Sequence, residues 1–333
     1  ALIVAAVLLF FWPVWLAGAT FPVGGGDLFG QLLPVWSYIS RFLRRGTLPL
    51  WSTQMMTGDP IVGEPQYGIF NPLNWWLFIV GAEHRGLILL RGMLPLTLAG
   101  AGVYTYLRRS SLWQLRVPAA LVGAFAYMLS DPFITHLGHP QMNDAMAWLP
   151  WALLGVDTIL DERRVVVWPT LVFASVVLTG HYQSALLTAA GTGLYALWRF
   201  SLLRPARWPK TGSRLALNLV CAAALTLPAV LPSLERYPHT ERAILQLEPW
   251  RGYQWPLDMA IDLVAPGFHG RGTLGFWAPW ARVEGGYAGA LTVFLALGSL
   301  LLSRRYRRIG FVVLLGTLSV LFALGHDGPI YPW

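Results

Sequence analysis

Long apolar runs, separated by short polar and often basic connections, recur along the whole chain. A helix of about 20 mostly apolar residues is long enough to cross the hydrocarbon core of a bilayer. The pattern therefore predicts an all-α, polytopic integral membrane protein that forms a single transmembrane domain over residues 1–333. We expect about nine spanning helices, at residues 1–19, 87–107, 117–130, 144–160, 165–179, 183–200, 215–233, 286–303 and 309–324.

Two further segments are expected to lie on the membrane surface. The run "LNWWLFIVG" at residues 73–81 is too short to span a bilayer, and its paired tryptophans favour the membrane interface. Residues 31–45 carry apolar residues at helical spacing and end in three arginines. This segment is predicted to be an amphipathic interfacial helix whose basic end lies near lipid phosphates.

The distribution of charge fixes an orientation for these helices. If residues 73–81 do not cross and the N-terminus is cytoplasmic, the cytoplasmic connections hold 14 of the 24 basic residues and only three acidic ones. If residues 73–81 crossed, every later loop would change sides and this positive-inside bias would reverse. We therefore expect a multi-pass protein of the plasma (inner) membrane with two long external loops, residues 20–86 and 234–285. The high pI follows from this topology, so no nucleic-acid partner is expected.

Composition excludes several classes of protein. Hydrophobic residues make up 55% of the chain and charged residues 12%, which leaves too little polar surface for an ordinary soluble protein. The one cysteine, Cys221, can form no intrachain disulfide. The first run lacks the basic region and cleavage site of a signal peptide. The chain begins without Met and stops just after a polar turn, so we expect truncation, above all at the C-terminus. Sequence motifs of ATP-driven pumps, serine hydrolases, zincins and thiol enzymes do not occur.

Two short motifs nearly repeat each other. They are "GHPQ" at 138–141 and "GHYQ" at 180–183, and each stands at the predicted external start of a helix. All seven histidines fall on the predicted external side, although the greater length of the external loops explains part of this bias. His and Gln each offer a hydrogen-bond donor and an acceptor, which suits sugar hydroxyls and phosphates. The alternative is that both motifs are ordinary helix ends. "GEPQYG" at 63–68 is loosely similar, so the candidate substrate-binding residues are His139, Gln141, His181, Gln183, Glu64 and Gln66.

Two carboxylates are candidates for catalysis. Asp27 follows "GGG" just beyond the first helix, with Gln31 one turn later as a further substrate-binding candidate. Asp144 opens the predicted helix 144–160, where a carboxylate is costly unless it is paired, binds metal or faces water. Each could instead be a helix N-cap. Together they could share acid–base chemistry or bind a divalent cation such as Mg or Mn. In the second external loop, Arg271 is a candidate phosphate ligand.

The order of these segments resembles that of a known family. It runs from "GGGDLFGQLLP" through "GTLPLWSTQMMTGDPIVGEPQYGIFNPLNW" and the two G-H-x-Q motifs to "FWAPWARVEGGYAGALTVFLALGSL" and "LFALGHDGPIYPW". Over nearly its whole length the chain is similar to the bacterial YfhO-like membrane proteins, whose layout resembles that of GT-C class glycosyltransferases. The resemblance implies transfer of a sugar from a polyprenyl-phosphate donor to an envelope polymer or protein acceptor outside the cytoplasm. It implies a catalytic carboxylate at Asp27, which would deprotonate or orient the acceptor hydroxyl, and a second acidic position at Asp144, with Asp131 as the alternative.

Two other classes of function stay open. A transporter or lipid flippase would also need polar groups among its helices, but it would more often place charges midway along them. Arg91 is the clear charge within a predicted span, and it lies near one end. A non-catalytic envelope assembly protein would account for the helices and loops, but not for the clustering of external histidines and carboxylates.

Overall fold

A computed structural model of the chain describes residues 1–19, 27–55, 58–162, 165–240, 243, 254–270, 286–302, 306–325 and 328–330. The prediction of an all-α fold is confirmed, because helices form nearly all of the regular structure in these residues. Two short strands, β1 (Trp51–Ser52) and β2 (Asp59–Pro60), pair antiparallel. Within the described residues, two helical segments, Gly86–Arg109 and Pro205–His239, are long and apolar enough to cross a membrane. The full set of nine spans stays a prediction.

The contacts within the chain divide it into two compact units, and the single transmembrane domain stays a prediction. Unit 1 comprises residues 1–128 and 136–244, and unit 2 comprises residues 129–135 and 245–333. The helices of unit 1 are α1 (Leu2–Phe10), α2 (Trp12–Leu16), α3 (Leu33–Leu43), α4 (Pro72–Val80), α5 (Arg85–Arg109), α6 (Val117–Met128), α8 (Pro140–Asp161), α9 (Trp168–Leu178), α10 (Tyr182–Ser201) and α11 (Trp208–Arg236). Unit 2 holds α7 (Asp131–Thr135), α14 (Ala290–Leu302) and α15 (Tyr306–Ala323).

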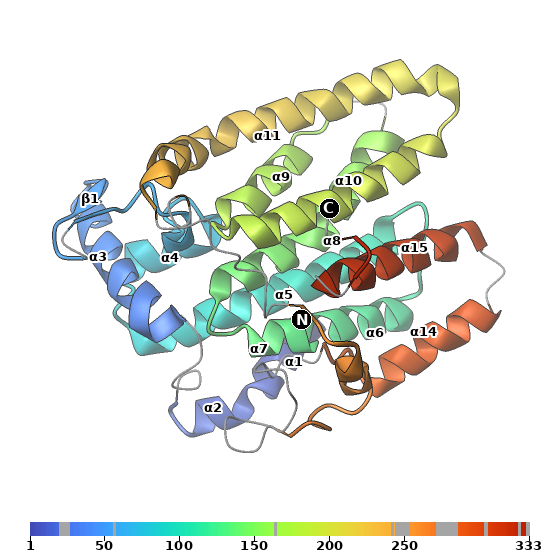
Figure 1. Cartoon of the computed structure of the whole chain (residues 1–333), viewed down its shortest axis with the longest axis horizontal. Coiled ribbons are helices and arrows are strands. Elements are labelled where there is room, and N and C mark those ends of the chain that lie inside the picture. Colours follow the sequence, from blue (N-terminus) through green and yellow to red (C-terminus); the bar gives the residue numbers. More distant parts are fainter. Residues whose placement is uncertain are drawn as a thin grey trace. The chain divides into compact units, whose positions relative to one another are not determined.

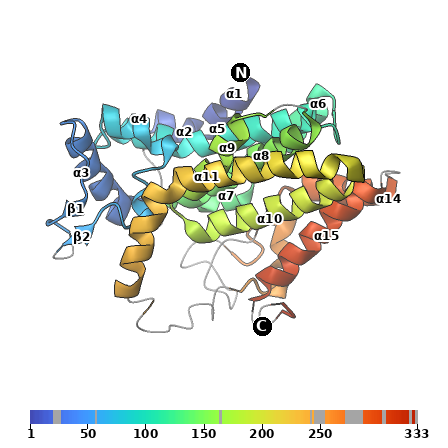
Figure 2. The ribbon, with the colours of Figure 1, turned by 90° about the horizontal axis from the view of Figure 1, so that it is seen from above.

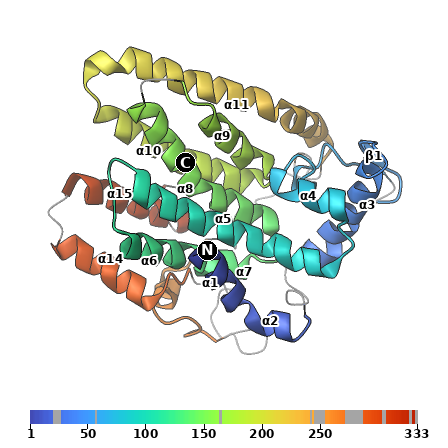
Figure 3. The ribbon, with the colours of Figure 1, turned by 180° about the vertical axis from the view of Figure 1, so that it is seen from behind.

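The core of unit 1 is built on α5 and α8. Helix α5 lies between α6 and α8, and α8 also contacts α9 and α10 (Figure 1, Figure 3). Fully buried alanines let these helices approach closely, as is typical of helix packing in membranes. Many leucines on α10 and α11 face outward instead, among them Leu186 at 68% and Leu197 at 71% exposure. Outward-facing leucines of this kind suit contact with lipid.

Unit 1 has two chemically different ends. At the first end, the starts of α5, α8 and α10 meet the loop 58–71, where Arg236 at the end of α11 pairs with Glu64. At the second end, Arg199 near the end of α10 pairs with Asp157 near the end of α8. In unit 1, residues predicted to be external lie at the first end and those predicted to be cytoplasmic at the second. Figure 2 shows α3, α4 and the β1–β2 hairpin grouped where α11 ends, so α4 begins and finishes at the first end.

Several helix boundaries differ from the predicted ones. The run 1–19 breaks at Phe11, whose ψ of 12° departs from helical geometry, and Pro13 follows in the first turn of α2. The segment 31–45, predicted to be interfacial, begins as a π-helical turn at Leu28–Leu32 and continues into α3. Helix α8 begins at Pro140 rather than at residue 144, because proline suits the first helical position. Asp144 therefore lies inside the helix and is not its N-cap.

Candidate functional site

Asp27 and His139 come together at the first end of unit 1. Asp27 occupies the N-cap position of the π-helical turn, yet its side chain makes no capping hydrogen bond. The Leu28 N–H donates to the Gly138 carbonyl at 3.1 Å, which holds this segment against the residues before α8. As a result, Asp27 Oδ2 lies 3.8 Å from His139 Nε2, and the two side chains are 50% and 38% exposed. Two of the residues singled out in the sequence thus form one accessible acid–histidine pair.

A second histidine borders this pair. The ring of His136 lies 6.0 Å from that of His139, centroid to centroid, at an angle of 58°. The tight turn between them, in which the His139 N–H donates to the His136 carbonyl at 2.9 Å, brings the rings together. His136 was predicted to be external but to have no role at the site, although its spacing from His139 in "HLGH" is a visible signal. Asp27, His136 and His139 are called the Asp27 cluster below.

The loop Glu64–Tyr67 touches both G-H-x-Q motifs. The Gln141 side-chain amide donates to the Gln66 carbonyl. The Pro65 carbonyl lies so close to Gly180 that a Cβ at residue 180 would stand 1.8 Å from its oxygen. The Tyr67 carbonyl accepts a hydrogen bond from Trp36 Nε1 at 3.0 Å. The three carbonyls of residues 65–67 therefore contact three different parts of unit 1.

His181 serves as a helix end rather than as a partner of Asp27 in the contacts observed. It is the N-cap of α10, and its Nδ1 accepts a hydrogen bond from the Ser184 N–H at 3.2 Å. Gln183 is exposed in the first turn of α10, and Gln31 is half-buried in the π-helical turn. For "GHYQ", the helix-end alternative describes His181, whereas "GHPQ" supplies His139 to the Asp27 cluster.

Glu64 belongs to an ion-pair cluster. It bonds to Arg236 and caps the short 3₁₀ turn after it by accepting from the Gln66 N–H at 3.2 Å. Arg236 also reaches Asp59 at 3.2 Å, and the Tyr67 hydroxyl donates to Asp59 at 2.5 Å. Burial, reinforced by the neighbouring carboxylates, raises the pKa of the Tyr67 phenol, so it stays a donor at neutral pH. These contacts give Glu64 a role in joining α11 to the loop, and sequence reasoning missed Arg236 as its partner.

Of the three alternatives for Asp144, namely pairing, metal binding or contact with water, the structure shows pairing. Its side chain is fully buried, and Arg91 donates to both of its oxygens, at 3.0 Å to Oδ1 and 2.5 Å to Oδ2. Asn71 Nδ2 donates to Oδ2 at 2.6 Å. Arg91 in turn donates to Asn74 Oδ1 at 2.6 Å and lies over the Trp36 ring at 5.8 Å. A carboxylate held in this way does not fit a catalytic base, so Asp144 is better described as half of a structural ion pair.

The metal hypothesis finds no support in the same geometry. Within the described residues, no group of three or more His, Cys, Asp or Glu side chains could hold a metal ion. A cation shared by Asp27 and Asp144 does not fit, because the Arg91 guanidinium already occupies both Asp144 oxygens. Asp131, the alternative to Asp144 as the second acidic position, belongs to unit 2. Its carboxylate accepts a hydrogen bond from the Gly286 N–H at 2.8 Å. Arg271 lies outside the described residues.

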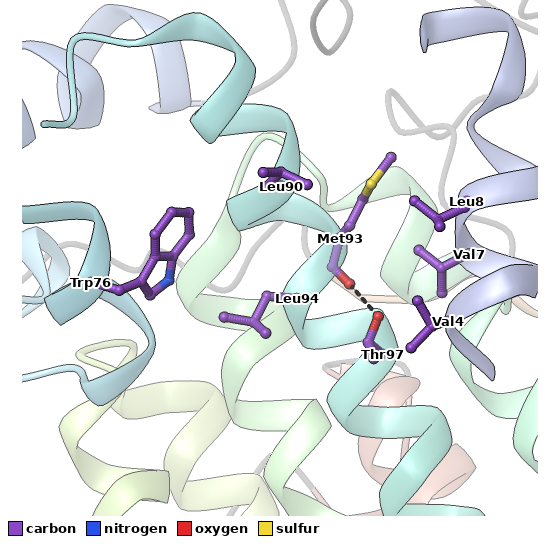
Figure 4. A pocket seen from close by; sticks show the side chains of 8 residues that line it. All are labelled: Val4, Val7, Leu8, Trp76, Leu90, Met93, Leu94 and Thr97. Atoms are coloured by element: carbon purple, nitrogen blue, oxygen red, sulfur yellow. Dashed lines mark hydrogen bonds between the residues drawn. The ribbon is translucent and has the colours of Figure 1, made fainter. Parts of the chain in front are cut away.

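An apolar cavity of about 390 Å³ lies between α1, α4 and α5 (Figure 4). Trp76 of α4 stands on one side of it, across from Val7 of α1. The one hydroxyl in its wall, that of Thr97, donates to the Met93 carbonyl at 3.1 Å and so is already satisfied. On α5 the cavity begins at Leu90, next to Arg91. It therefore lies in the half of α5 that is nearer to the first end.

A known protein family matches nearly the whole of this chain. The family described as bacterial membrane protein YfhO covers residues 1–326. This chain belongs to the YfhO family. The apolar helices and the family together identify it as a bacterial membrane protein, which confirms the resemblance seen in the sequence. No curated protein and no solved structure matches this YfhO-family chain.

Replacing Gly180 with alanine is expected to destabilise unit 1 by more than about 1–3 kcal/mol. Gly180 has a φ of +86°, which strains any L side chain, and its Cβ would also collide with the Pro65 carbonyl. Thermal unfolding of the detergent-purified protein measures the effect. Gly191→Ala is the matched control, since a Cβ there meets no atom within 4 Å. Equal melting temperatures for the two variants would contradict the close contact between this motif and the 64–67 loop.

Proposed function

We propose that this YfhO-family protein is a membrane glycosyltransferase of the GT-C type. It would transfer a sugar from a polyprenyl-phosphate donor to a hydroxyl of an envelope polymer or protein on the external side of the membrane. The observation that carries the proposal is the half-exposed Asp27 carboxylate 3.8 Å from the His139 imidazole, at the end of unit 1 predicted to be external. A general base next to a group able to bind phosphate is the minimum that such a transfer needs.

Each member of the Asp27 cluster has a distinct role in this proposal. Asp27 takes the proton of the acceptor hydroxyl as the acceptor oxygen forms the new glycosidic bond. The bond between the sugar carbon and the phosphate oxygen breaks, and polyprenyl phosphate leaves. His139 and His136 donate hydrogen bonds to the phosphate as its charge develops. The accessibility of Asp27 and His139 supports this assignment, because a soluble or polymeric acceptor has to reach them.

The apolar cavity between α1, α4 and α5 supports a lipid-linked donor. Its volume of about 390 Å³ and its hydrocarbon walls suit part of an isoprenoid chain. Because the cavity lies in the half of α5 nearer to the first end, a chain held there would keep its phosphate toward the same end as Asp27. This relation favours a lipid-linked sugar over a soluble sugar nucleotide as the donor.

The test is transfer of labelled sugar from a polyprenyl-phosphate hexose by the full chain reconstituted in liposomes. Asp27→Asn is expected to lower the rate roughly 100-fold, because the amide cannot accept the proton. Glu83→Gln is the matched control. Glu83 is also an exposed carboxylate near the first end, where it pairs with Arg44 at 2.6 Å, and we expect its variant to keep wild-type activity.

Two results would overturn the proposal. Full transfer activity in Asp27→Asn would remove Asp27 from the chemistry. Movement of the intact donor across the bilayer without transfer to any acceptor would identify a flippase instead.

A further inference from the structure

A second apolar groove, distinct from the cavity beside α1, opens among α8, α9, α10 and α11. Its volume is about 320 Å³, and nearly all of its wall is hydrocarbon. Small residues on α10 and α11 create the space, because they leave the helices without bulky side chains there. The groove, called the α11 groove below, is defined by the wall residues Val156, Gly193, Ala196, Leu215, Ala222 and Thr226.

The length of the α11 groove matches one leaflet of a bilayer. Along α11 its wall runs from Leu215 to Thr226. At about 1.5 Å per residue this is about 16 Å, roughly half of the ~30 Å hydrocarbon core. The groove starts near the N-terminus of α11, beside Val156 and Ala196 in the C-terminal halves of α8 and α10. Its dimensions therefore suit one acyl chain of the leaflet at the second end.

Basic residues precede Leu215, the residue at one end of the groove, along the chain. Arg204, Arg207 and Lys210 are exposed just before or within the first turn of α11. Arg207 is held in place by a hydrogen bond from Nη2 to the Leu160 carbonyl at 2.8 Å. Arg214, adjacent to Leu215, donates to the Thr211 hydroxyl at 3.1 Å.

Acidic side chains at the same end offset part of this charge, and Arg199 is shared between two of them, Asp157 and Asp161. Asp161 is already paired with Arg199 at 3.2 Å and accepts from Ser111 at 2.7 Å. Glu162 is exposed beyond the end of α8. Trp208 is also exposed and packs on Phe200 with ring centroids 5.8 Å apart, an arrangement that suits the headgroup region. The surroundings of the groove mouth therefore favour a negatively charged headgroup.

We propose that the α11 groove binds an anionic glycerophospholipid. One acyl chain would lie between Leu215 and Thr226, and the phosphate would contact Arg204, Arg207 and Lys210. Charge complementarity at the mouth and a depth of one leaflet carry the proposal. This site goes beyond the proposed sugar transfer. Its headgroup end lies toward the second end of unit 1, where Val156 is 17 residues, or about 25 Å, along α8 from His139.

Two leucine substitutions on α10 test the groove itself. A Cβ at Gly193 meets no atom within 4 Å, and Gly193 lines the groove, so Gly193→Leu would place a side chain in the groove with room at its Cβ. Gly191 is equally open but is not part of the wall, so Gly191→Leu is the matched control. Native mass spectrometry of the detergent-purified full chain, titrated with phosphatidylglycerol, measures bound lipid. We expect roughly tenfold weaker lipid binding for Gly193→Leu, because the new side chain would keep about two methylenes of the acyl chain out of the groove. Gly191→Leu should bind the lipid as tightly as the unaltered chain does.

Two glutamine substitutions test the headgroup contacts. Arg204→Gln combined with Lys210→Gln is expected to remove most of the preference for phosphatidylglycerol over phosphatidylcholine, a change on the order of tenfold. Arg41→Gln combined with Arg45→Gln removes two exposed charges at the other end of unit 1 and should leave the preference intact.

Three results would overturn the proposal. One is equal binding of the two lipids by the unaltered chain, and another is unchanged binding in Gly193→Leu. The third is displacement of phosphatidylglycerol by polyprenyl phosphate, which would assign the groove to the donor instead. Sugar transfer can fail or persist independently of all three, so this test and that of the proposed function remain distinguishable.

Discussion

Asp144→Ala is expected to lower the free energy of unfolding by about 3–5 kcal/mol, a large part of the stability of a typical domain. The variant leaves the Arg91 guanidinium buried at 1% exposure without its counter-charge. The neutral side chain of Asn74, which bonds to Arg91 Nε, cannot compensate for a full positive charge. Denaturant or thermal unfolding in detergent, with size-exclusion chromatography to follow the folded fraction, measures the loss.

A double variant separates a structural role of Asp144 from a catalytic one. Arg91→Met combined with Asp144→Leu removes both charges and is expected to recover most of the lost stability, because no uncompensated ion remains. Asp27→Ala, which removes an exposed acid at the same end, should cost no more than about 0.5 kcal/mol. If Asp144→Ala instead kept the stability of the unaltered chain and lost only sugar transfer, the structural assignment would be wrong.

A loss of similar size, about 3–5 kcal/mol, is expected for Arg199→Met at the second end. Asp157 is only 2% exposed, and Arg199 Nε donates to its Oδ1 at 2.6 Å. Without Arg199, the carboxylate keeps the neutral donors Tyr195 and Ser110, at 2.7 and 2.5 Å, but no positive charge. Hydroxyl donors stabilise a buried carboxylate less than an ion pair does.

Arg204→Met is the control for this second measurement, because Arg204 is exposed near the same end. Its melting temperature should stay within experimental scatter of that of the unaltered protein. Arg199→Lys keeps a positive charge but not the fork that also reaches Asp161, so it should recover only part of the stability. Melting temperatures that rank Met equal to or above Lys would show that the Asp157 carboxylate does not depend on this charge.

The sequence was informative where structure is local. Apolar runs of helical length predicted an all-α chain, and the helices at 72–80 and 33–43 were expected to within a few residues. The start of α8 was also readable in principle, since Pro140 after His139 is a typical first helical residue. The predicted start at residue 144 instead coincides with the onset of the apolar run, which lies one turn inside the helix.

Contacts between distant segments lay beyond the sequence. Arg91 and Asp144 are 53 residues apart, and nothing in either neighbourhood indicates that the two side chains face each other. Asp27 and His139 were both singled out, but their approach depends on the backbone bond from Leu28 to Gly138. Pairing of that kind arises from the packing of whole elements. Hydropathy and motif spacing do not encode it directly.

The loop of residues 65–67 has a consequence for how members of this family can vary. Its three successive carbonyl oxygens contact three different elements. The first packs against Gly180 in the turn before α10, and the other two accept hydrogen bonds from side chains of α8 and α3. The contacts use backbone oxygens, so many side-chain replacements at Gln66 should be tolerated. An insertion or deletion of one residue would shift each oxygen to the wrong partner. We therefore expect related chains to keep the length of this segment constant even where its amino acids differ.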